Sequence, residues 1–338
     1  MKFLVTGGAG FIGSHIVEKL LKDGHDVVVL DNFFSGKEAN LSFTKDYTLN
    51  ATRYTLIKGD IRDKSTCAAA CSGIDYVLHQ AALRSVPKSM KDPESYNDVN
   101  IGGTLNMLQA AAKAKVKRFV FASSSSVYGD VAEFPQKETF YPKLISPYAL
   151  SKLAGEYYCR IFSEHFGLET ICLRYFNVFG PRQALDDEYA VVIPKFIHSI
   201  LHDAQPPIFG NGRQSRDFTY IDNVVEANFL SATTKRLFPS ELNGTLSQET
   251  VSESTAPKNI HEFFNVANGH DHTVLELVEM INKIIGKNIE PKFLPLRAGD
   301  VFRTCADITE IKTKLGFIGK VSFAEGLKNT VDYWKELA

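Results

Sequence analysis

The sequence predicts an α/β protein in which a doubly wound parallel sheet is joined to a smaller α/β substrate-binding lobe. Three observations predict this fold class. Short apolar runs alternate with helical stretches over the first half of the chain, a glycine-rich turn follows the first run, and the alternation loosens after about Phe179. Strands that alternate with helices in this way are typical of βαβ units, which build parallel sheets.

The candidate strands are short runs rich in apolar and β-branched residues. They are Lys2–Thr6, Asp26–Leu30, Tyr54–Lys58, Asp75–His79, Arg118–Ala122 and Glu169–Arg174. Helical patterns between them include Gly13–Lys22, Asn100–Lys113 and Pro147–Phe166. Nearly continuous apolar strands indicate that helices cover both faces of the sheet.

The second half of the chain contains more proline, glycine and loop-like sequence, and helical periodicity returns at Thr273–Ile285 and at the C-terminus. We expect a first domain at 1–178, to which segments near 217–236 and 261–267 return. The substrate-binding lobe is expected at 179–216 and 268–338. The polar, Ser/Thr-rich stretch 239–260 is expected to be a mobile surface loop.

The composition excludes several classes of protein. The 338 residues suggest about two domains of ~150 residues each. With 38 Lys+Arg against 39 Asp+Glu, the formal net charge is −1, which argues against a nucleic-acid backbone or an anionic membrane as the main partner. No apolar run reaches the ~18 residues that span a bilayer, and the segment MKFLVTGGAGFIG is not expected to act as a secretory signal. A cytoplasmic location is expected.

The five cysteines predict buried, inert thiols and no metal site. They are Cys67, Cys71, Cys159, Cys172 and Cys305, and no second CxxxC pair accompanies Cys67 and Cys71. A lone pair with this spacing is a poor zinc candidate.

A glycine-rich turn indicates a dinucleotide site of the Rossmann type. Gly7, Gly10 and Gly13 follow the first strand directly and lead into a helix, which allows a tight turn and close backbone approach to a pyrophosphate. Asp31 ends the second strand, 18 positions beyond Gly13. A carboxylate there accepts hydrogen bonds from ribose hydroxyls and repels a 2′-phosphate, which favours NAD over NADP. Asp60 and Ile61 follow the third strand, where they either meet the adenine or form a plain turn.

A second constellation predicts acid–base catalysis. Ser146 is a candidate helix N-cap with Pro147 at the first helical position, and Tyr148 and Lys152 lie four residues apart on one face of that helix. Because a nearby ammonium stabilises phenolate, we expect Lys152 to lower the pKa of Tyr148 from its usual value of about 10.

Four serines follow the fifth candidate strand, Ser123 to Ser126. The carboxyl edge of such a sheet is where ligands bind, so Ser124 is expected beside Tyr148, hydrogen-bonded to the reacting oxygen of the substrate. Ser124, Tyr148 and Lys152 are the predicted catalytic residues, next to a nicotinamide.

The segments TGGAGFIG, HQAA, SSSSVYG, YxxxK, RYFNVFGP and RDFTYIDNV together resemble those of extended short-chain dehydrogenases/reductases. More narrowly, the chain resembles nucleotide-sugar 4-epimerases, and LHQAALRSVPKS, RYFNVFGPRQ and SRDFTYIDNV are most similar to bacterial UDP-N-acetylglucosamine 4-epimerases. The resemblance covers nearly the whole chain apart from 239–260. It implies that Tyr148 takes the proton of the sugar 4-hydroxyl while hydride passes to bound NAD, and that the 4-keto sugar turns before hydride returns to its opposite face.

The resemblance also implies a set of cofactor-binding residues. Together with the turn and the acidic positions, it gives Gly7, Gly10, Phe11, Ile12, Gly13, Asp31, Asn32, Asp60, Ile61, Gln80, Ala81, Ala82, Asn100, Tyr148, Lys152 and Tyr175. Lys152 is expected to hold the nicotinamide ribose, and NAD is expected to stay bound between turnovers.

The substrate-binding residues implied by the resemblance are Arg84, Ser85, Ser124, Ser125, Asn177, Val191, Arg216, Arg297, Asp300 and Thr304. Arg216 and Arg297 match diphosphate clamps, a role that suits bidentate guanidinium groups. Asp300 matches a contact to the uridine ribose. Asn177 matches a contact near the sugar and diphosphate, and Val191 and Thr304 match positions around the rotating sugar.

Two positions bear on the reaction and the sugar. Related dehydratases and decarboxylases carry acids where this chain has Ser125 and Ser126, so simple epimerisation is favoured. In the family that the chain resembles, a large aromatic residue at the position of Thr304 restricts turnover to non-acetylated sugars, while small residues admit an N-acetyl group. The resemblance therefore favours UDP-GlcNAc and UDP-GalNAc and leaves UDP-Glc and UDP-Gal open.

Arg84 departs from the glycine that the most similar relatives usually carry. It either pairs with the carboxylate of a UDP-glucuronate-type substrate or points to solvent.

Two alternative functions of another class are a reductase that catalyses net hydride transfer and a non-catalytic protein that senses NAD. The helices at Asn100–Lys113 and Pro147–Phe166 are expected to form a homodimer contact, as they do in relatives.

Overall fold

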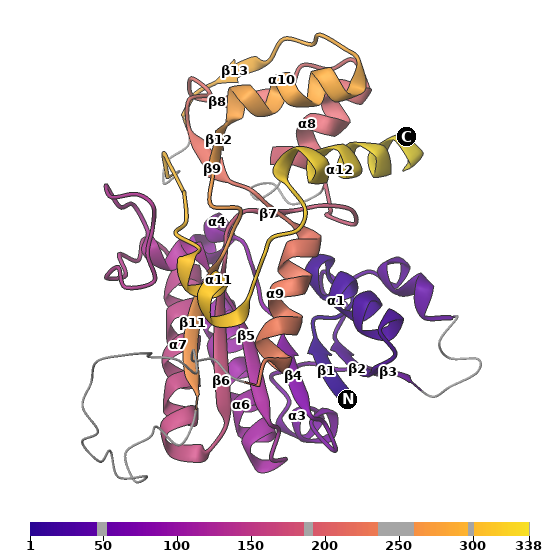
Figure 1. Ribbon diagram of the computed structural model, residues 1–338, viewed down its shortest axis with the longest axis vertical. Coiled ribbons are helices and arrows are strands. Elements are labelled where there is room, and N and C mark those ends of the chain that lie inside the picture. Colours follow the sequence, from indigo (N-terminus) through magenta and orange to yellow (C-terminus); the bar gives the residue numbers. More distant parts are fainter. Residues whose placement is uncertain (46–52, 186–191, 236–259, 297–300, 338) are drawn as a thin grey trace, which may run out of the picture.

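A computed structural model describes residues 1–45, 53–185, 192–235, 260–296 and 301–337. Its central feature is a seven-stranded parallel sheet (Figure 1), which confirms the predicted fold class. The strands are β1 (Lys2–Thr6), β2 (Asp26–Asp31), β3 (Tyr54–Lys58), β4 (Tyr76–His79), β5 (Arg118–Ser124), β6 (Glu169–Tyr175) and β11 (His261–Val266). The six predicted strands all form. Three of them extend further than predicted, since β2 reaches Asp31, β5 reaches Ser124 and β6 reaches Tyr175, and β4 begins one residue later, at Tyr76.

The strand order is β11-β6-β5-β4-β1-β2-β3, and each neighbouring pair is parallel. The chain therefore winds outward from β1 in both directions, and β1 lies between β2 and β4. The carboxyl ends on either side of this reversal are where a doubly wound sheet binds ligands.

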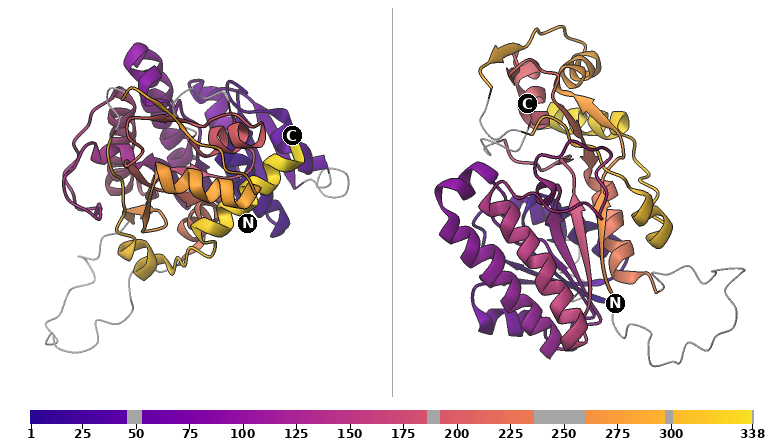
Figure 2. Two further views of the ribbon diagram at one scale, coloured as in Figure 1. Left: turned by 90° about the horizontal axis from the view of Figure 1, so that it is seen from above. Right: turned by 90° about the vertical axis from the view of Figure 1, so that its left-hand side faces the viewer.

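Helices cover both faces of the sheet (Figure 2). One layer contains α1 (Phe11–Lys22) and α9 (Ile221–Thr233), which pack against each other. The opposite layer contains α3 (Lys64–Ala70), α6 (Thr104–Lys113) and α7 (Pro147–Phe166). Each layer buries the apolar side chains that alternate strand residues present to it.

The predicted helix at Asn100–Lys113 forms in two parts. A π-helical turn, η2 (Asn97–Gly103), precedes α6, and α4 (Val86–Lys91) and α5 (Pro93–Tyr96) lead into it. In η2, a Cβ at Gly103 would lie 2.5 Å from the Ile61 side chain, so this turn packs closely against the loop after β3.

The ends of α7 match the prediction. The Ser146 side chain accepts a hydrogen bond from the Ala149 N–H, Pro147 occupies the first turn, and Gly167 ends the helix in the left-handed conformation at φ +71°. This cap determines where the helix begins, and hence where Tyr148 lies.

A lobe lies beyond the carboxyl end of the sheet (Figure 1). It contains α8 (Val192–Leu201), α10 (Val274–Ile285) and α12 (Phe323–Leu337), which pack against one another. Three pairs of short strands belong to this region: β8 (Pro207–Phe209) with β13 (Lys292–Leu294), β9 (Ser215–Asp217) with β12 (Asp271–Thr273), and β7 (Val178–Phe179) with β10 (Thr219–Tyr220). α11 (Thr309–Leu315) returns to lie against β11.

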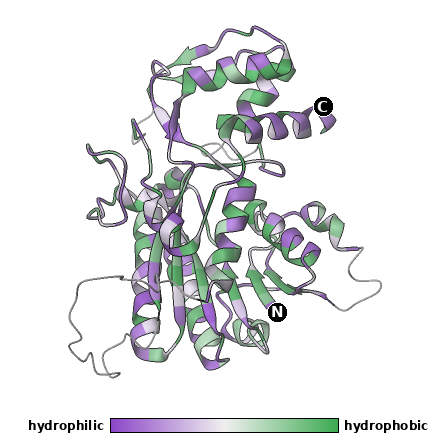
Figure 3. Cartoon of the chain, in the orientation of Figure 1, coloured by the Kyte–Doolittle hydropathy of each residue, from purple (hydrophilic) through white to green (hydrophobic). Residues whose placement is uncertain are grey.

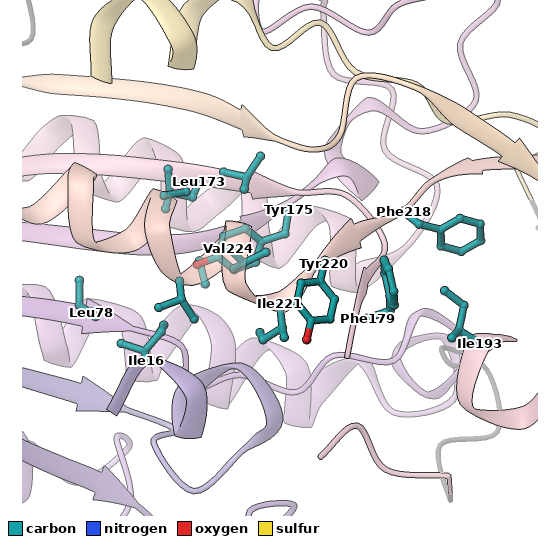
Figure 4. Packing of buried hydrophobic residues seen from close by; sticks show 14 of the residues in the cluster. Ile16, Leu78, Leu173, Tyr175, Phe179, Ile193, Phe218, Tyr220, Ile221 and Val224 are labelled. Carbon is teal, nitrogen blue, oxygen red and sulfur yellow. The ribbon is translucent and has the colours of Figure 1, made fainter. Parts of the chain in front are cut away.

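The apolar core is continuous between sheet and lobe. Figure 3 shows that the strands of the sheet are mostly hydrophobic, and Figure 4 follows the buried cluster from Leu78 and Leu173 in the sheet to Phe218 and Ile193 at the lobe. A second cluster fills the opposite side, between the sheet and the layer of α3, α6 and α7.

Within the described ranges, no helix is long and apolar enough to cross a membrane.

All five cysteines are buried and free, as predicted, and burial raises the pKa of Cys67 and Cys71 to about 12. The predicted loop 239–260 lies outside the described residues, apart from its last position.

Candidate active site

The glycine-rich turn after β1 has the geometry that close approach to a ligand requires. Gly7 adopts φ +67°, and its N–H donates to the Leu30 carbonyl at 2.8 Å. A Cβ at Gly13 would lie 2.1 Å from the Gly7 carbonyl oxygen, so no other residue fits there. The twelve-residue helix α1 begins directly after Gly10 and points its N-terminus at the turn.

Asp31 ties the end of β2 to this turn. Its carboxylate accepts hydrogen bonds from the Ala9 N–H at 2.9 Å and the Phe33 N–H at 2.7 Å. Burial raises the pKa of Asp31, although both N–H groups favour the charged form. The carboxylate therefore lies beside the turn, as the dinucleotide prediction requires.

Asp60 belongs to a charged cluster after β3. Arg62 donates to both carboxylate oxygens, at 3.0 and 2.8 Å, and Asn32 donates at 2.8 Å. These hydrogen bonds from Arg62 hold the pKa of Asp60 well below its usual range. Asn32 and Asp60, both predicted to bind the cofactor, thus meet directly across the ends of β2 and β3.

A cavity of about 400 Å³ begins at this turn and runs along the carboxyl edge of the sheet to Tyr148 and Lys152. Of the sixteen predicted cofactor-binding residues, fifteen line it: Gly7, Gly10, Phe11, Ile12, Gly13, Asp31, Asn32, Asp60, Ile61, Gln80, Ala81, Ala82, Tyr148, Lys152 and Tyr175. The donors and acceptors along this path fit a dinucleotide, because the helix N-terminus suits a pyrophosphate and the Asp31 carboxylate suits ribose hydroxyls.

Asn100 lies one layer behind the cavity. Its side chain accepts from the Leu83 N–H at 2.8 Å and donates to the Leu83 carbonyl at 2.9 Å and to Ser151 Oγ at 3.0 Å. The asparagine therefore holds the loop after β4 against α7. Its position in the sequence gave no sign of this, because its partners are remote.

Gln80 and Tyr175 both line the cavity, and the Tyr175 hydroxyl donates to Gln80 Oε1 at 3.1 Å. A residue that the sequence did not single out joins both of them. Asn228, on α9, accepts from Gln80 Nε2 at 3.0 Å and donates to the Tyr175 hydroxyl at 2.8 Å. This buried network fixes two predicted cofactor residues from behind.

The predicted catalytic residues come together at the end of β5. The Tyr148 hydroxyl shares a hydrogen bond with the Ser124 side chain. Lys152 Nζ donates to the Ala122 carbonyl at 2.7 Å and lies 5.9 Å from the centre of the Tyr148 ring. Ser125 begins the short helix η3 (Ser125–Tyr128) directly beyond.

The expected direction of the Tyr148 pKa shift is wrong for this structure. Burial raises the pKa of Tyr148, and the hydrogen bond from Ser124 and the charge of Arg84 only partly oppose it. Lys152 points at the strand carbonyl instead of the phenol. Burial also lowers the pKa of Lys152, to about 8.

Arg84 and Ser85 follow β4 on the opposite wall. Arg84 lines the cavity, and its charge favours the phenolate of Tyr148. The Ser85 side chain caps α4 by accepting from the Lys88 N–H at 3.2 Å, and the Ser85 N–H donates to the Tyr96 hydroxyl at 3.0 Å. Ser85 is thus placed to hold the loop beside Tyr148.

Two predicted substrate residues meet on the lobe side. Asn177 Nδ2 donates to Thr304 Oγ1 at 3.0 Å and to the Asp217 carbonyl at 3.1 Å. The Asp217 side chain accepts from the N–H groups of Asn268, Gly269 and Ala306 at 2.9, 3.0 and 3.1 Å. Burial raises its pKa to about 7. This carboxylate joins three segments that are far apart in the sequence.

Arg216 is next to this carboxylate on β9. Its guanidinium donates to the backbone carbonyls of Ser215 and Phe302 at 2.9 and 3.1 Å, which places it on the segment that leads to Thr304. The other predicted substrate residues, Val191, Arg297 and Asp300, lie outside the described residues.

Sequence reasoning missed several residues that line the cavity. They include Phe34, Ser35, Lys37, Asn40, Lys88, Tyr96 and Arg182. A signal exists for the first four, because they follow Asp31 in one continuous segment, DNFFSGKEAN. Tyr96 has no local signal, since its contact with the Tyr148 ring, at 6.3 Å between centroids, depends on packing between separate helices.

The fold and the site define an NAD-dependent enzyme of the extended short-chain dehydrogenase/reductase class. The family model described as "NAD dependent epimerase/dehydratase family" matches residues 3–242, and the chain belongs to this family.

Relatives and solved structures match along the whole chain. A UDP-glucose 4-epimerase of Mycolicibacterium smegmatis is 35% identical, with 99% of each chain covered. A UDP-N-acetylglucosamine 4-epimerase from Methanobrevibacter ruminantium M1, in complex with UDP-N-acetylmuramic acid, has a TM-score of 0.87 at 38% identity, covering 100% of this chain and 99% of that one. A UDP-glucuronic acid 4-epimerase from Bacillus cereus, bound to UDP-glucuronic acid and NAD, has a TM-score of 0.85 at 33% identity with both chains fully covered. These similarities confirm the predicted enzyme class, an NAD-dependent UDP-sugar 4-epimerase, and its cofactor.

Proposed function

We propose that this enzyme interconverts UDP-GlcNAc and UDP-GalNAc, with Tyr148 as the acid/base at the sugar 4-oxygen. The observation that carries the chemistry is the Tyr148–Ser124 hydrogen bond at the inner end of the cavity, with Lys152 beside it. A phenol that shares a hydrogen bond with a hydroxyl can pass a proton to and from a substrate oxygen placed between them.

Each side chain has a distinct part in this proposal. Ser124 orients the 4-oxygen, and Tyr148 removes its proton and returns it. Lys152 binds the nicotinamide ribose, and Arg84 supplies a positive charge that favours the phenolate. NAD, when bound, supplies the acceptor and the donor of hydride. Because the raised pKa of Tyr148 disfavours a free phenolate, charges in the loaded site must assist proton removal.

The choice of an N-acetylated sugar rests on the hydrogen-bonded pair Asn177 and Thr304 on the lobe side, which we propose as the wall of the sugar site. Thr304 is a small residue, and its hydroxyl accepts from Asn177, which leaves the wall polar and without a large aromatic side chain at that position. An amide substituent would find hydrogen-bonding groups there. The similarity to the UDP-N-acetylglucosamine 4-epimerase supports the same choice.

A second candidate substrate is a UDP-hexuronate. Arg84 lines the cavity close enough for its charge to favour the Tyr148 phenolate, so an anionic substituent on the sugar would meet a cation. The similarity to a UDP-glucuronic acid 4-epimerase is in keeping with this alternative.

The test is incubation of the purified protein with UDP-GlcNAc, UDP-Glc or UDP-GlcA without added NAD, followed by separation of the 4-epimers. We expect conversion of UDP-GlcNAc to UDP-GalNAc, which would also show that NAD is retained. Conversion of UDP-GlcA alone would replace the proposed substrate with the uronate. No conversion of any sugar, even with NAD added, would overturn the epimerase proposal.

We further propose that 1–178, with the returning segments near 217–236 and 261–267, holds NAD, while 179–216 and 268–338 hold the UDP-sugar. We also propose that the protein is a cytoplasmic homodimer, and that the exposed face of α7 forms the contact between the two chains. Leu150, Tyr157 and Ile161 on this helix are 52%, 58% and 42% exposed, and Met90 and Ile145 extend the apolar surface beside it. An apolar face of this kind marks an interface.

Light scattering tests the dimer. We expect a mass of about twice 37.6 kDa, and a monomeric mass for a chain carrying Leu150→Lys and Ile161→Lys. The control is Lys328→Glu, which changes the charge on helix α12, away from the proposed contact. This variant should keep the mass of the wild-type protein. A monomeric wild-type protein would contradict the proposal.

A further inference from the structure

The last three residues of β5 each contact α7. The Ala122 carbonyl accepts from Lys152 Nζ at 2.7 Å, Ser123 Oγ donates to Glu156 Oε1 at 2.5 Å, and the Ser124 side chain shares its hydrogen bond with Tyr148. The helix partners are spaced at i, i+4 and i+8, so they form one stripe along α7. Each of the last three residues of the strand therefore has one partner in this stripe.

Glu156 is the member of this stripe that has no part in the proposed chemistry. It is 5% exposed, and Arg174 on β6, itself 3% exposed, donates to both its oxygens at 2.9 and 2.7 Å. Arg174 also donates to the Tyr128 hydroxyl at 3.0 Å. The bidentate pair leaves the carboxylate little freedom, because a guanidinium holds its partner in a fixed plane.

A buried ion pair of this kind adds little stability over a well-packed apolar pair, because both charges lose their hydration. Here the ion pair serves to fix the position of the groups that are bound to it. Oε1 receives both Arg174 Nε and Ser123 Oγ, so the position of Ser123 depends on the placement of the ion pair. Ser124 is the next residue of the strand.

The same carboxylate faces the ammonium of Lys152, one turn earlier on α7. Its charge raises the pKa of Lys152 against the burial that lowers it to about 8. The other titratable groups around this ammonium are Tyr148 on α7 and His79 on β4, whose pKa burial and the Lys152 charge lower to about 3. His79 is thus neutral, and Glu156 is the anion that favours a charged lysine.

We propose that Glu156, held by Arg174, is a positioning residue: through Ser123 it fixes the end of β5 in the register that joins Ser124 to Tyr148. The inference rests on the proposed function, since Tyr148 must be the acid/base for the register to matter. Glu156 itself touches no reacting atom.

The test compares substitutions along the stripe with a matched control in the same helix. Ser123→Ala removes the hydroxyl and leaves the ion pair intact. Glu156→Asp keeps the charge and withdraws the carboxylate by one methylene. Ser163→Ala is the control, because Ser163 is equally buried on α7 and donates to the Ile260 carbonyl at 2.9 Å, away from the site.

We expect Ser123→Ala and Glu156→Asp to lower kcat about tenfold or more while KM for the UDP-sugar changes less than about threefold, since a misplaced catalytic group costs rate more than binding. Ser163→Ala should keep the wild-type kcat. Glu156→Gln, where it folds, should move the alkaline limb of the kcat profile to lower pH, because Lys152 then loses its proton more readily. Thermal unfolding of each variant shows whether it is folded during the assay.

Wild-type kcat in folded Ser123→Ala and Glu156→Asp would overturn the inference, and so would an equal loss of kcat in Ser163→Ala. If the wild-type enzyme converts no UDP-sugar, the proposed function fails before any variant is compared, so the two failures are distinguishable.

Discussion

Two buried carboxylates organise the two sides of this site in different ways. Glu156 lies behind the catalytic edge of the sheet and is bound by side chains, Arg174 and Ser123. Asp217 lies beside the proposed substrate residues Asn177 and Thr304 and is bound by backbone N–H groups, among them those of Gly269 and Ala306. On the catalytic side, side chains from two strands hold the carboxylate of a helix residue. On the lobe side, backbone N–H groups from separate segments hold the other carboxylate.

The kind of hydrogen-bond partner also determines how well the charge of each carboxylate is balanced. The guanidinium of Arg174 neutralises Glu156, whereas the three N–H groups around Asp217 are dipoles that only partly offset the loss of water, and the pKa of Asp217 rises to about 7. Catalytic geometry should therefore depend on individual side chains, while the substrate wall should depend on the protonation of one carboxyl group.

The largest expected effect belongs to the catalytic side. Tyr148→Phe removes the hydroxyl that is hydrogen-bonded to Ser124, and we expect turnover to fall by at least about 10³-fold with NAD still bound, because the ring and its packing against Tyr96 remain. Epimerisation assays and the nucleotide content of the purified protein check this. Substantial residual activity would remove Tyr148 from the acid/base role.

A backbone change at the cofactor turn comes next. Gly13→Ala places a methyl group where only 2.1 Å separates it from the Gly7 carbonyl oxygen, so the turn must open, and we expect loss of bound NAD and about 1–3 kcal/mol of stability. Gly102→Ala is the control, because the nearest atom is 3.8 Å away. NAD retained in Gly13→Ala would show that the turn does not hold the cofactor.

The Asp217 junction predicts a pH effect on stability. Its folded pKa of about 7 lies above the usual 3.8, so its carboxyl group favours folding at low pH and this contribution is lost as pH rises between those values. Asp217→Asn should therefore become more stable relative to wild type across this window, by up to about 1.4 kcal/mol per pH unit. Chemical unfolding at pH 4.5, 6 and 7.5 measures the difference, and a constant difference would refute it.

The smallest expected effect comes from removing the same kind of helix cap in each of the two regions. Ser146→Ala and Thr273→Ala each remove an N-cap hydroxyl, from α7 and from α10, and each should cost about 1 kcal/mol. Only Ser146→Ala should also lower kcat, because Tyr148 lies in the first turn of its helix. Equal kcat in both variants would show that the α7 cap does not position the tyrosine.

Local patterns in the sequence determined much of this protein. The glycine turn, the strand runs, the cap of α7 and the spacing of Tyr148 and Lys152 all depend on residues within about two helical turns of one another, where backbone conformation and side-chain periodicity are encoded directly. For the same reason the six sheet strands of the first half were predictable. About half of the residues that line the cavity were predicted as well, some of them, such as Gln80 and Tyr175, only through the family resemblance.

Tertiary structure decided what depends on remote partners and on burial. Asn177 meets Thr304 across 127 residues of sequence, Asn100 turns to the Leu83 loop, and Glu156 becomes a positioning residue because β6 brings Arg174 to it. The raised pKa of Tyr148 also belongs here. Desolvation depends on how many atoms the whole fold places around a group, and no local pattern of residues contains that quantity.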